Sequence, residues 1–246
     1  METVSKRISL LDEIRGFAVI LMVLYHLLYN LAYVYYVPFA LKTMYALLPY
    51  DTVIGTIFVT VSGISSQFSR SNVKRGLKIL PIALIITLVT YFFMYDMRIM
   101  FGVLHFLSIA MIYYGLTKKL HNKIPSWLGL ILSFVLWLAT KKIYMGEIAF
   151  FFSVPRFFYN TNIFFPLGMY SASFYSSDYF PFFPWIFVFL FGTYLGKFIK
   201  NHTMPSFMYK QHCKALTFLG KHALVIYVVH QPLLFGILWV IFSIFN

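Results

Sequence analysis

Residues Gly16–Val37 read GFAVILMVLYHLLYNLAYVYYV, which is 22 consecutive residues without a charged side chain. A helix of about 20 apolar residues spans the hydrocarbon core of a bilayer, so this stretch predicts a transmembrane helix. Asp12, Glu13 and Arg15 stand immediately before it, and no A-x-A-like cleavage site follows it. We therefore expect an uncleaved first helix rather than a secretory signal peptide.

The composition of the whole chain also fits a membrane protein. Of its 246 residues, 61% are hydrophobic and only 11% are charged, whereas about a quarter of the residues in a soluble domain are charged. The mean hydropathy of +0.79 excludes an intrinsically disordered chain, which combines low hydrophobicity with high charge. The single cysteine, Cys213, excludes an internal disulfide and any metal site built from several cysteines.

Seven apolar segments are long enough to be considered as membrane-spanning helices. They are Gly16–Val37, Thr52–Ser69, Ile79–Tyr95, Ile99–Thr117, Ile124–Thr140, Tyr179–Gly196 and His222–Asn246. The sequence contains no internal repeat and no linker long enough to separate two domains. We therefore predict an all-α fold, a polytopic transmembrane helical bundle of about seven helices, formed by residues 1–246 as a single integral-membrane domain.

The positions of the basic residues predict the orientation of this bundle. With seven helices, fourteen Lys and Arg residues lie on one side of the membrane and five lie on the other, while Arg15 stands at the membrane edge. Cytosolic loops carry the excess of basic residues, so the N-terminus is predicted to be cytosolic and the C-terminus extracytoplasmic. The net charge of +13 is then explained by the cytosolic loops, and we expect no nucleic-acid partner.

One region does not read as a simple helix. Residues 143–178 are rich in Phe, Tyr, Ser and Asn, and Pro155 and Pro166 interrupt them. Aromatic rings favour the headgroup level of a membrane, so this stretch is either a re-entrant or interfacial segment or an ordinary outer loop. The sequence leaves both alternatives open.

Ionisable side chains inside a bilayer are costly, so each of them needs an explanation. Arg15 and His26 are 11 residues apart, a spacing that places them on one face of an α-helix. Asp12 lies three residues before Arg15, within ion-pairing distance on a helix, and Asn30 follows His26 by one turn. Asp12, Arg15, His26 and Asn30 are called the polar stripe below, and we predict that this stripe faces the protein interior.

Three histidines from three predicted helices fall at nearly the same depth. Counted at about 1.5 Å per residue from the cytosolic end, His26 lies about 15 Å deep, His105 about 18 Å and His230 about 12 Å. Zinc needs three or four ligands, and no HxxxH or HxxE pair pre-forms such a site, so we predict no metal. Imidazole titrates near neutral pH, which favours acid–base chemistry at this level. The alternative for each histidine is a hydrogen bond to a neighbouring helix. His121, His202 and His212 lie in predicted cytosolic connections and are expected to be exposed to water.

Five blocks of the sequence, in order, resemble the catalytic-domain family of heparan-alpha-glucosaminide N-acetyltransferase, a family of membrane acyltransferases. The blocks are RISLLDEIRGFAVILMVLYHLLYNL (7–31), FVTVSGISSQFS (58–69), FGVLHFLSIAMIYY (101–114), SSDYFPFFPWIFVFLFGTYLG (176–196) and FLGKHALVIYVVHQPLL (218–234). The spacing of Arg15 and His26 is also similar to the Arg–His spacing of acyltransferase family 3. The blocks cover nearly the whole chain.

The resemblance implies transfer of an acyl group, typically acetyl from acetyl-CoA, to an acceptor handled at the outer face. The polar positions of the family's blocks are occupied here by Asp12, Arg15, His26, His105, His230 and Gln231. The catalytic histidine of the lysosomal enzyme lies in an outer loop after the first helix, whereas that loop here, Pro38–Asp51, contains no histidine. The catalytic role therefore falls to His26 by position, and heparan fragments are not assumed as acceptors.

The resemblance also implies that acetyl-CoA or another acyl-CoA is the donor substrate, entering from the cytosol, with no bound cofactor. Arg15 is expected to bind or steer the donor, with Asp12 orienting Arg15. His26 is expected to remove a proton from the acceptor or to relay the acyl group, and His105 or His230 to assist it. The remaining candidate substrate-binding residues are Asn30, Ser62, Tyr227 and Gln231.

Donor phosphates need cationic partners, and one predicted cytosolic loop supplies four of them. These residues, called the basic cluster below, are Arg70, Lys74, Arg75 and Lys78. The alternative is that the basic cluster only sets the topology.

The predicted function is therefore a membrane-bound acyltransferase with an unknown amine or hydroxyl acceptor. High contents of Phe, Tyr, Ile, Lys and Asn suggest an AT-rich bacterial genome, which favours a multi-pass protein of the plasma membrane and an envelope carbohydrate as acceptor. A proton-coupled transporter or flippase is the main alternative, because ionisable residues within the membrane are also typical of carriers. The lack of an internal repeat disfavours this alternative. A non-catalytic scaffold would leave the three histidines at one depth unexplained.

Overall fold

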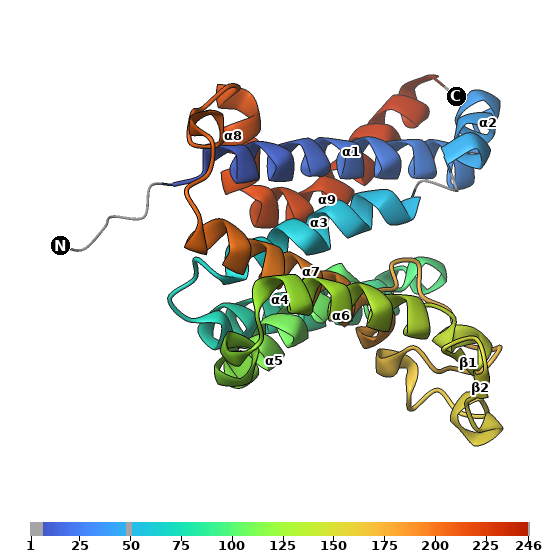
Figure 1. Cartoon of the computed structure of the whole chain (residues 1–246). Coiled ribbons are helices and arrows are strands. Elements are labelled where there is room, and N and C mark those ends of the chain that lie inside the picture. The colour runs from blue at the N-terminus through green and yellow to red at the C-terminus, as the bar shows by residue number, and fades with distance from the viewer. Residues whose placement is uncertain (1–6, 48–50, 246) are drawn as a thin grey trace. The chain divides into compact units, whose positions relative to one another are not determined.

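A computed structural model describes residues 7–47 and 51–245 of the chain (Figure 1). Nine α-helices lie within the described residues: α1 Ser9–Tyr33, α2 Pro38–Leu47, α3 Asp51–Ser66, α4 Asn72–Phe93, α5 Val103–Lys123, α6 Ser126–Thr140, α7 Phe182–Asn201, α8 Lys214–Lys221 and α9 Ala223–Phe245. Two short strands, β1 (Glu147–Ile148) and β2 (Phe152–Ser153), form one antiparallel hairpin. The predicted all-α fold class is confirmed.

Each of the seven predicted segments overlaps a helix, namely α1, α3, α4, α5, α6, α7 and α9, although α1 and α4 each begin seven residues before the predicted segment. Two helices were not predicted. The loop expected at Pro38–Asp51 contains α2, and the connection after the sixth segment contains α8. Proline is well placed at the start of α2, because the first residue of a helix needs no N–H group. Lys6, which contributes to the predicted charge bias, and Asn246 lie outside the described residues.

In the part of the chain that the structure describes, five helices are long and apolar enough to cross a membrane: Ser9–Tyr33, Asn72–Phe93, Ser126–Met145, Phe182–Asn201 and Ala223–Ile244. The helices α2 and α3 would add a sixth span if they cross the membrane as one bent pair. α5 is as long as these helices, but its last two turns carry Lys118, Lys119 and Lys123. The helices indicate a multi-pass membrane protein, and both the count of seven spans and the cytosolic N-terminus stay predictions.

Local sequence explains several helix boundaries. The Ser71 hydroxyl accepts a hydrogen bond from the backbone N–H of Lys74 at 3.3 Å and so caps the start of α4. Pro125 and Pro181 stand immediately before α6 and α7, where a missing N–H group has no cost. Pro232 instead lies inside α9, two residues after His230, and removes one backbone donor from this helix.

The chain divides into two compact units, which are described separately. Unit 1 comprises the described residues up to Val61 and those from Met204 onward, and unit 2 comprises Ser62–Thr203. The boundary falls within α3. The prediction that residues 1–246 form a single domain stays a prediction.

In unit 1, α1 packs against α2, α8 and α9. Val19 and Met22 of α1 are buried against Ala223 at the start of α9, and further along α1 Ala32 is buried against Ala40 and Met44 of α2. These apolar contacts hold α1 against α9 and against α2. The side chains of the polar stripe have to fit between these apolar contacts.

In unit 2, α4 pairs with α5 and α6 pairs with α7. Phe106 and Tyr114 of α5 and Phe189 of α7 have no exposed surface and form the largest buried side chains of this unit. Residues 143–178, all of which are described, contain the β1–β2 hairpin and three 3₁₀ turns but no α-helix. Residues 143–178 therefore form no further α-helix, and the two predicted alternatives for this region stay predictions.

Candidate functional site

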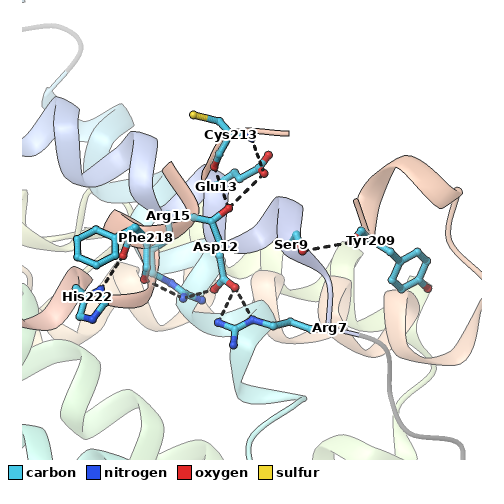
Figure 2. A network of polar contacts seen from close by, with 11 residues as sticks. Arg7, Ser9, Asp12, Glu13, Arg15, Tyr209, Cys213, Phe218 and His222 are labelled. Atoms are coloured by element: carbon cyan, nitrogen blue, oxygen red, sulfur yellow. Dashed lines mark hydrogen bonds and ion pairs between the residues drawn. The ribbon is translucent and has the colours of Figure 1, made fainter. Parts of the chain in front are cut away.

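The polar stripe begins with a carboxylate held between two guanidinium groups (Figure 2). In the first turn of α1, Asp12 Oδ2 accepts a hydrogen bond from Arg7 at 2.7 Å, and Asp12 Oδ1 accepts one from Arg15 at 3.0 Å. The Asp12 side chain is only 8% exposed. A buried charge is tolerated when it is paired and hydrogen-bonded, and Asp12 meets both conditions.

Glu13, the next residue, binds the start of α8 (Figure 2). Glu13 Oε1 accepts hydrogen bonds from the backbone N–H groups of His212 and Cys213 at 2.6 and 3.1 Å, and one from the Thr217 hydroxyl at 3.3 Å. His212 and Cys213 stand immediately before α8, with Cys213 as its N-cap residue. The N-terminus of a helix carries a partial positive charge, so a carboxylate is favourable beside it. Sequence reasoning missed this role, because His212 is 199 residues away along the chain.

Arg15 contacts the opposite end of the same helix. Its Nη1 atom donates a hydrogen bond to the backbone carbonyl of Gly220 at 3.3 Å, in the last turn of α8. The carbonyl groups at a helix C-terminus carry a partial negative charge and favour a cation. α1 thus places an anion at the positive end of α8 and a cation at its negative end. Glu13, Arg15 and Gly220 are called the α8 clamp below.

Two glycines allow α1 and α8 to approach closely. A Cβ atom at Gly16 would lie 2.0 Å from the carbonyl oxygen of Leu216, and one at Gly220 would lie 1.8 Å from the carbonyl oxygen of Asp12. Real Cβ atoms essentially never approach a backbone oxygen to less than 3.0 Å. Both positions therefore require glycine, and the hydrogen bonds of the α8 clamp form across this contact.

We expect Arg15→Ala and Asp12→Asn to lower the yield of folded protein to a similar extent, because each removes one partner of the same ion pair. Breaking a buried pair costs about 3–5 kcal/mol, and the cost is lower here because the Arg15 side chain is 24% exposed. The measurement is the monodisperse fraction after detergent extraction, together with the KM for acyl-CoA of that fraction. A normal yield with a raised KM for Arg15→Ala alone would instead assign Arg15 to the donor.

Further along α1, His26 meets His230 of α9. The centroids of the two imidazole rings are 4.9 Å apart, and the ring planes make an angle of 85°, an edge-to-face arrangement. His230 is buried and His26 is half-buried. Two of the three histidines predicted to share one depth are thus in direct contact, and they are called the histidine pair below.

Hydrogen bonds to the backbone define which nitrogen carries the proton in each neutral ring. His26 Nδ1 donates to the Met22 carbonyl at 2.9 Å, and His230 Nδ1 donates to the Tyr227 carbonyl at 2.6 Å. A carbonyl oxygen only accepts, so Nδ1 holds the proton in both rings. The Nε2 atom of each neutral imidazole then carries a lone pair that is able to accept a proton.

Beside the histidine pair, Asn30 of α1 bonds to Gln231 of α9. Asn30 Nδ2 donates to Gln231 Oε1 at 3.2 Å. Asn30 has no exposed surface, and its Oδ1 atom has no hydrogen-bond partner among the described residues. Unsatisfied buried oxygens are rare in native proteins, so this atom is a candidate acceptor for a substrate O–H or N–H group. The polar stripe therefore faces α8 in its first half and α9 in its second.

His105 lies in unit 2, where both of its ring nitrogens are engaged. The Gly102 backbone N–H donates to Nδ1 at 3.2 Å, and Nε2 lies 3.0 Å from the Thr87 hydroxyl, which itself donates to the Ile99 carbonyl at 2.7 Å. Nε2 must therefore carry the proton and donate to Thr87. These contacts favour a structural role at the start of α5. The depth of His105 relative to the histidine pair stays a prediction.

The remaining candidate residues are placed as follows. Tyr227 contacts the His230 ring at a centroid distance of 5.6 Å. Ser62 lies on α3 in unit 2. In unit 2, only Arg70 of the basic cluster lies in the connection before α4, whereas Lys74, Arg75 and Lys78 lie in the first two turns of this helix, so the prediction that all four lie in a loop is wrong. Arg70 and Lys74 are exposed and Arg75 is half-buried. The cations thus stand beside helix N–H groups, an arrangement that attracts phosphate.

The family model of the heparan-alpha-glucosaminide N-acetyltransferase catalytic domain matches residues 7–232. The chain belongs to this family. The match begins at Arg7, the first partner of Asp12, and extends past the histidine pair, so it contains every polar contact of α1 described above. A search of the curated proteins and a search of the solved structures each gave no significant match.

Membership of the heparan-alpha-glucosaminide N-acetyltransferase family confirms the resemblance seen in the sequence. It implies a membrane-bound transferase of the acetyltransferase type. The long apolar helices agree with this assignment, because they indicate a multi-pass membrane protein.

In this family member, the expectation that His121 is exposed to water is wrong. His121 is 7% exposed, and its Nδ1 atom lies 2.8 Å from the Tyr194 hydroxyl. Lys197 of α7 donates to backbone carbonyls at the end of α5, including that of Ile124 at 2.6 Å. Burial, followed by the positive charge of Lys197, lowers the pKa of His121. Its partner Tyr194 is 73 residues away along the chain, so no local pattern indicated this contact.

Proposed function

We propose that the chain transfers an acyl group, acetyl in the first instance, from acyl-CoA to an amine or hydroxyl acceptor, with His26 as the general base. The main support is the histidine pair, in which backbone hydrogen bonds leave a lone pair on Nε2 of each neutral ring. Family membership adds acetyltransferase chemistry. A weakly acidic hydroxyl or amine needs a base to become a nucleophile, and a neutral imidazole is suited to this task.

The proposed step is a direct attack on the thioester carbonyl. His26 Nε2 takes the proton from the acceptor as the acceptor oxygen or nitrogen forms a bond to the acyl carbon. The carbon–sulfur bond then breaks, and the CoA thiolate leaves and takes a proton from the His26 imidazolium or from water. His230 orients the His26 ring through the edge-to-face contact, and Asn30 Oδ1 accepts a hydrogen bond from the acceptor.

The donor is proposed to bind through its phosphates to the basic cluster at the start of α4. Arg70 and Lys74 are exposed, and the first N–H groups of α4 add a partial positive charge. If the predicted topology holds, this end of α4 faces the cytosol, where acyl-CoA is available. The contacts of Arg15 with Asp12 and Gly220 favour the α8 clamp over a donor site for this residue.

Arg70→Ala and Lys74→Ala are each expected to raise the KM for acyl-CoA by about 1.4- to 5-fold, with kcat nearly unchanged. An exposed charge interaction contributes about 0.2–1 kcal/mol, which corresponds to this range. The measurement is the initial rate against acyl-CoA concentration at low and high salt. Lys200→Ala, an exposed lysine at the end of α7, is the control. An unchanged KM in the Arg70/Lys74 double variant would leave the basic cluster with a topological role.

The acceptor is proposed to be an amine or hydroxyl compound at the outer face of a bacterial plasma membrane, with an envelope carbohydrate as the first candidate. The experiment that tests this function uses proteoliposomes supplied with acetyl-labelled acetyl-CoA and an extract of envelope carbohydrate. Labelled carbohydrate that depends on the protein supports the acyltransferase. Label that stays on the denatured protein would indicate an acyl-histidine intermediate, and proton-linked uptake without labelled product would favour the transporter.

A further inference from the structure

The β1–β2 hairpin of unit 2 follows directly on a membrane-spanning helix. The candidate span Ser126–Met145 ends two residues before Glu147, the first residue of β1. In the hairpin turn, the Ala149 backbone N–H donates a hydrogen bond to the Ala139 carbonyl at 2.7 Å. Ala139 belongs to the last turn of α6. The hairpin turn therefore lies against the last turn of α6, and Figure 1 shows the hairpin at that end of α6.

Three consecutive phenylalanines form this turn and the start of the returning strand. Phe150, Phe151 and Phe152 are 50%, 88% and 70% exposed. The rest of the described chain therefore leaves these rings largely uncovered. Each strand of the hairpin has two residues and extends only about 7 Å. This length is similar to the interfacial layer of about 5–7 Å on each side of the bilayer core.

The backbone of the turn is held in a conformation that favours glycine. Ala149 and Phe150 have φ angles of 51° and 65°, in the left-handed region. Residues with a Cβ atom adopt this region at a cost, and such conformations persist where the surrounding structure holds them. Here the hydrogen bond from the Ala149 N–H to the Ala139 carbonyl holds the turn against α6.

Two lysines stand beside the same ring. Lys141 Nζ lies 5.5 Å and Lys142 Nζ 5.6 Å from the centroid of the Phe150 ring. Lysines at the end of a spanning helix place their ammonium groups among the lipid headgroups, and aromatic rings favour the same level. The hairpin combines both features at the end of α6.

We propose that the β1–β2 hairpin is an interfacial membrane anchor. The side chains of Phe150, Phe151 and Phe152 lie at the boundary between headgroups and acyl chains in the leaflet where α6 ends. Lys141 contacts lipid phosphates at the same level, whereas Lys142 is paired with Glu147 Oε2 of the hairpin at 3.3 Å. The occupant of this aromatic surface is therefore lipid, and the anchor does not depend on the proposed acyl transfer.

Spin labelling in proteoliposomes tests this anchor. Cys213→Ser removes the single cysteine of the sequence, and Phe151→Cys then carries one nitroxide. Ile131→Cys, an exposed position in the middle of α6, is the lipid reference. Gln211→Cys, an exposed position in the polar connection before α8, is the water reference. Collision with oxygen, which concentrates in lipid, is compared with collision with a water-soluble nickel chelate by power saturation.

The Phe151 label is expected to show an oxygen-to-nickel accessibility ratio close to that of the Ile131 label. A ratio close to that of the Gln211 label would overturn the proposal in favour of an ordinary water-exposed loop. Low accessibility to both reagents would also overturn it, because another protein surface would then cover the rings. Phe152→Cys is labelled in parallel, so that the comparison stands if one of the two variants does not fold.

Discussion

His26→Ala is expected to lower the rate of acyl transfer by about 10²–10⁴-fold while the protein remains folded and inserted, because a general base typically contributes this much to a rate. His26 is half-buried and its Nδ1–H donates to the carbonyl of Met22 in its own helix. The substitution therefore removes the reactive Nε2 atom and the ring contact with His230, while the one hydrogen bond it breaks lies within α1. The measurement is kcat for labelled product, normalised to the monodisperse protein.

His202→Ala is the matched control for this substitution. His202 also donates from Nδ1 to the carbonyl four residues earlier, that of Phe198 at 2.8 Å, but its side chain is exposed at the end of α7. Its replacement is expected to leave turnover unchanged. If kcat of the His26→Ala variant lies within about two-fold of that of the unmodified protein, His26 is not the general base and is a hydrogen-bonded core histidine.

The polar stripe could be predicted from the sequence because its residues lie on one helix. The spacing of Asp12, Arg15, His26 and Asn30 depends only on helix geometry, and the high cost of lipid contact requires that such a face meets protein. The structure shows Asp12 bonded to Arg15, and Asn30 bonded to Gln231 of α9. The sequence did not predict the helices that pack against the polar stripe, because this packing depends on contacts between distant parts of the chain.

The histidines show the limit of reasoning from depth. His26, His105 and His230 have similar predicted depths, but depth does not define their hydrogen bonds. In the structure, both ring nitrogens of His105 are engaged at the start of α5, whereas His26 and His230 each donate from Nδ1 to a backbone carbonyl of their own helix. The difference arises from Thr87 on another helix, and no spacing in the sequence indicates it.

The α8 clamp was missed for a related reason. α8 has only eight residues and lies in a connection with several polar residues, so the sequence pattern did not indicate a packed helix. Glu13 binds the start of α8, and Gly220 allows the close helix contact, only because α1 and α8 cross at these residues. Position-specific needs of this kind, a carboxylate at a helix start and a glycine at a close contact, depend on tertiary structure.

Gly220→Ala is expected to lower the free energy of unfolding by about 1–3 kcal/mol or more, the usual range for overpacking a well-filled site. The new methyl group would lie 1.8 Å from the Asp12 carbonyl oxygen. A backbone atom cannot rotate away as a side chain can, so α8 has to move away from α1. This movement would weaken the Arg15–Gly220 hydrogen bond and displace Ala223, the first residue of the helix that carries His230. We therefore expect kcat to fall as well.

Gly236→Ala provides a matched control, because the same change in α9 places its Cβ where nothing lies within 4 Å. Alanine is favoured over glycine in helices by about 1 kcal/mol, so this variant is expected to be as stable as the unmodified protein or more stable. The measurements are the melting temperature in detergent and kcat for acetyl transfer. Because both variants add one methyl group to a helix, a difference between them isolates the contact between α1 and α8.

Equal melting temperatures of the Gly220→Ala and Gly236→Ala variants would show that α1 and α8 do not cross at this distance. A lower melting temperature with unchanged kcat would restrict the α8 clamp to folding and separate it from the histidine pair.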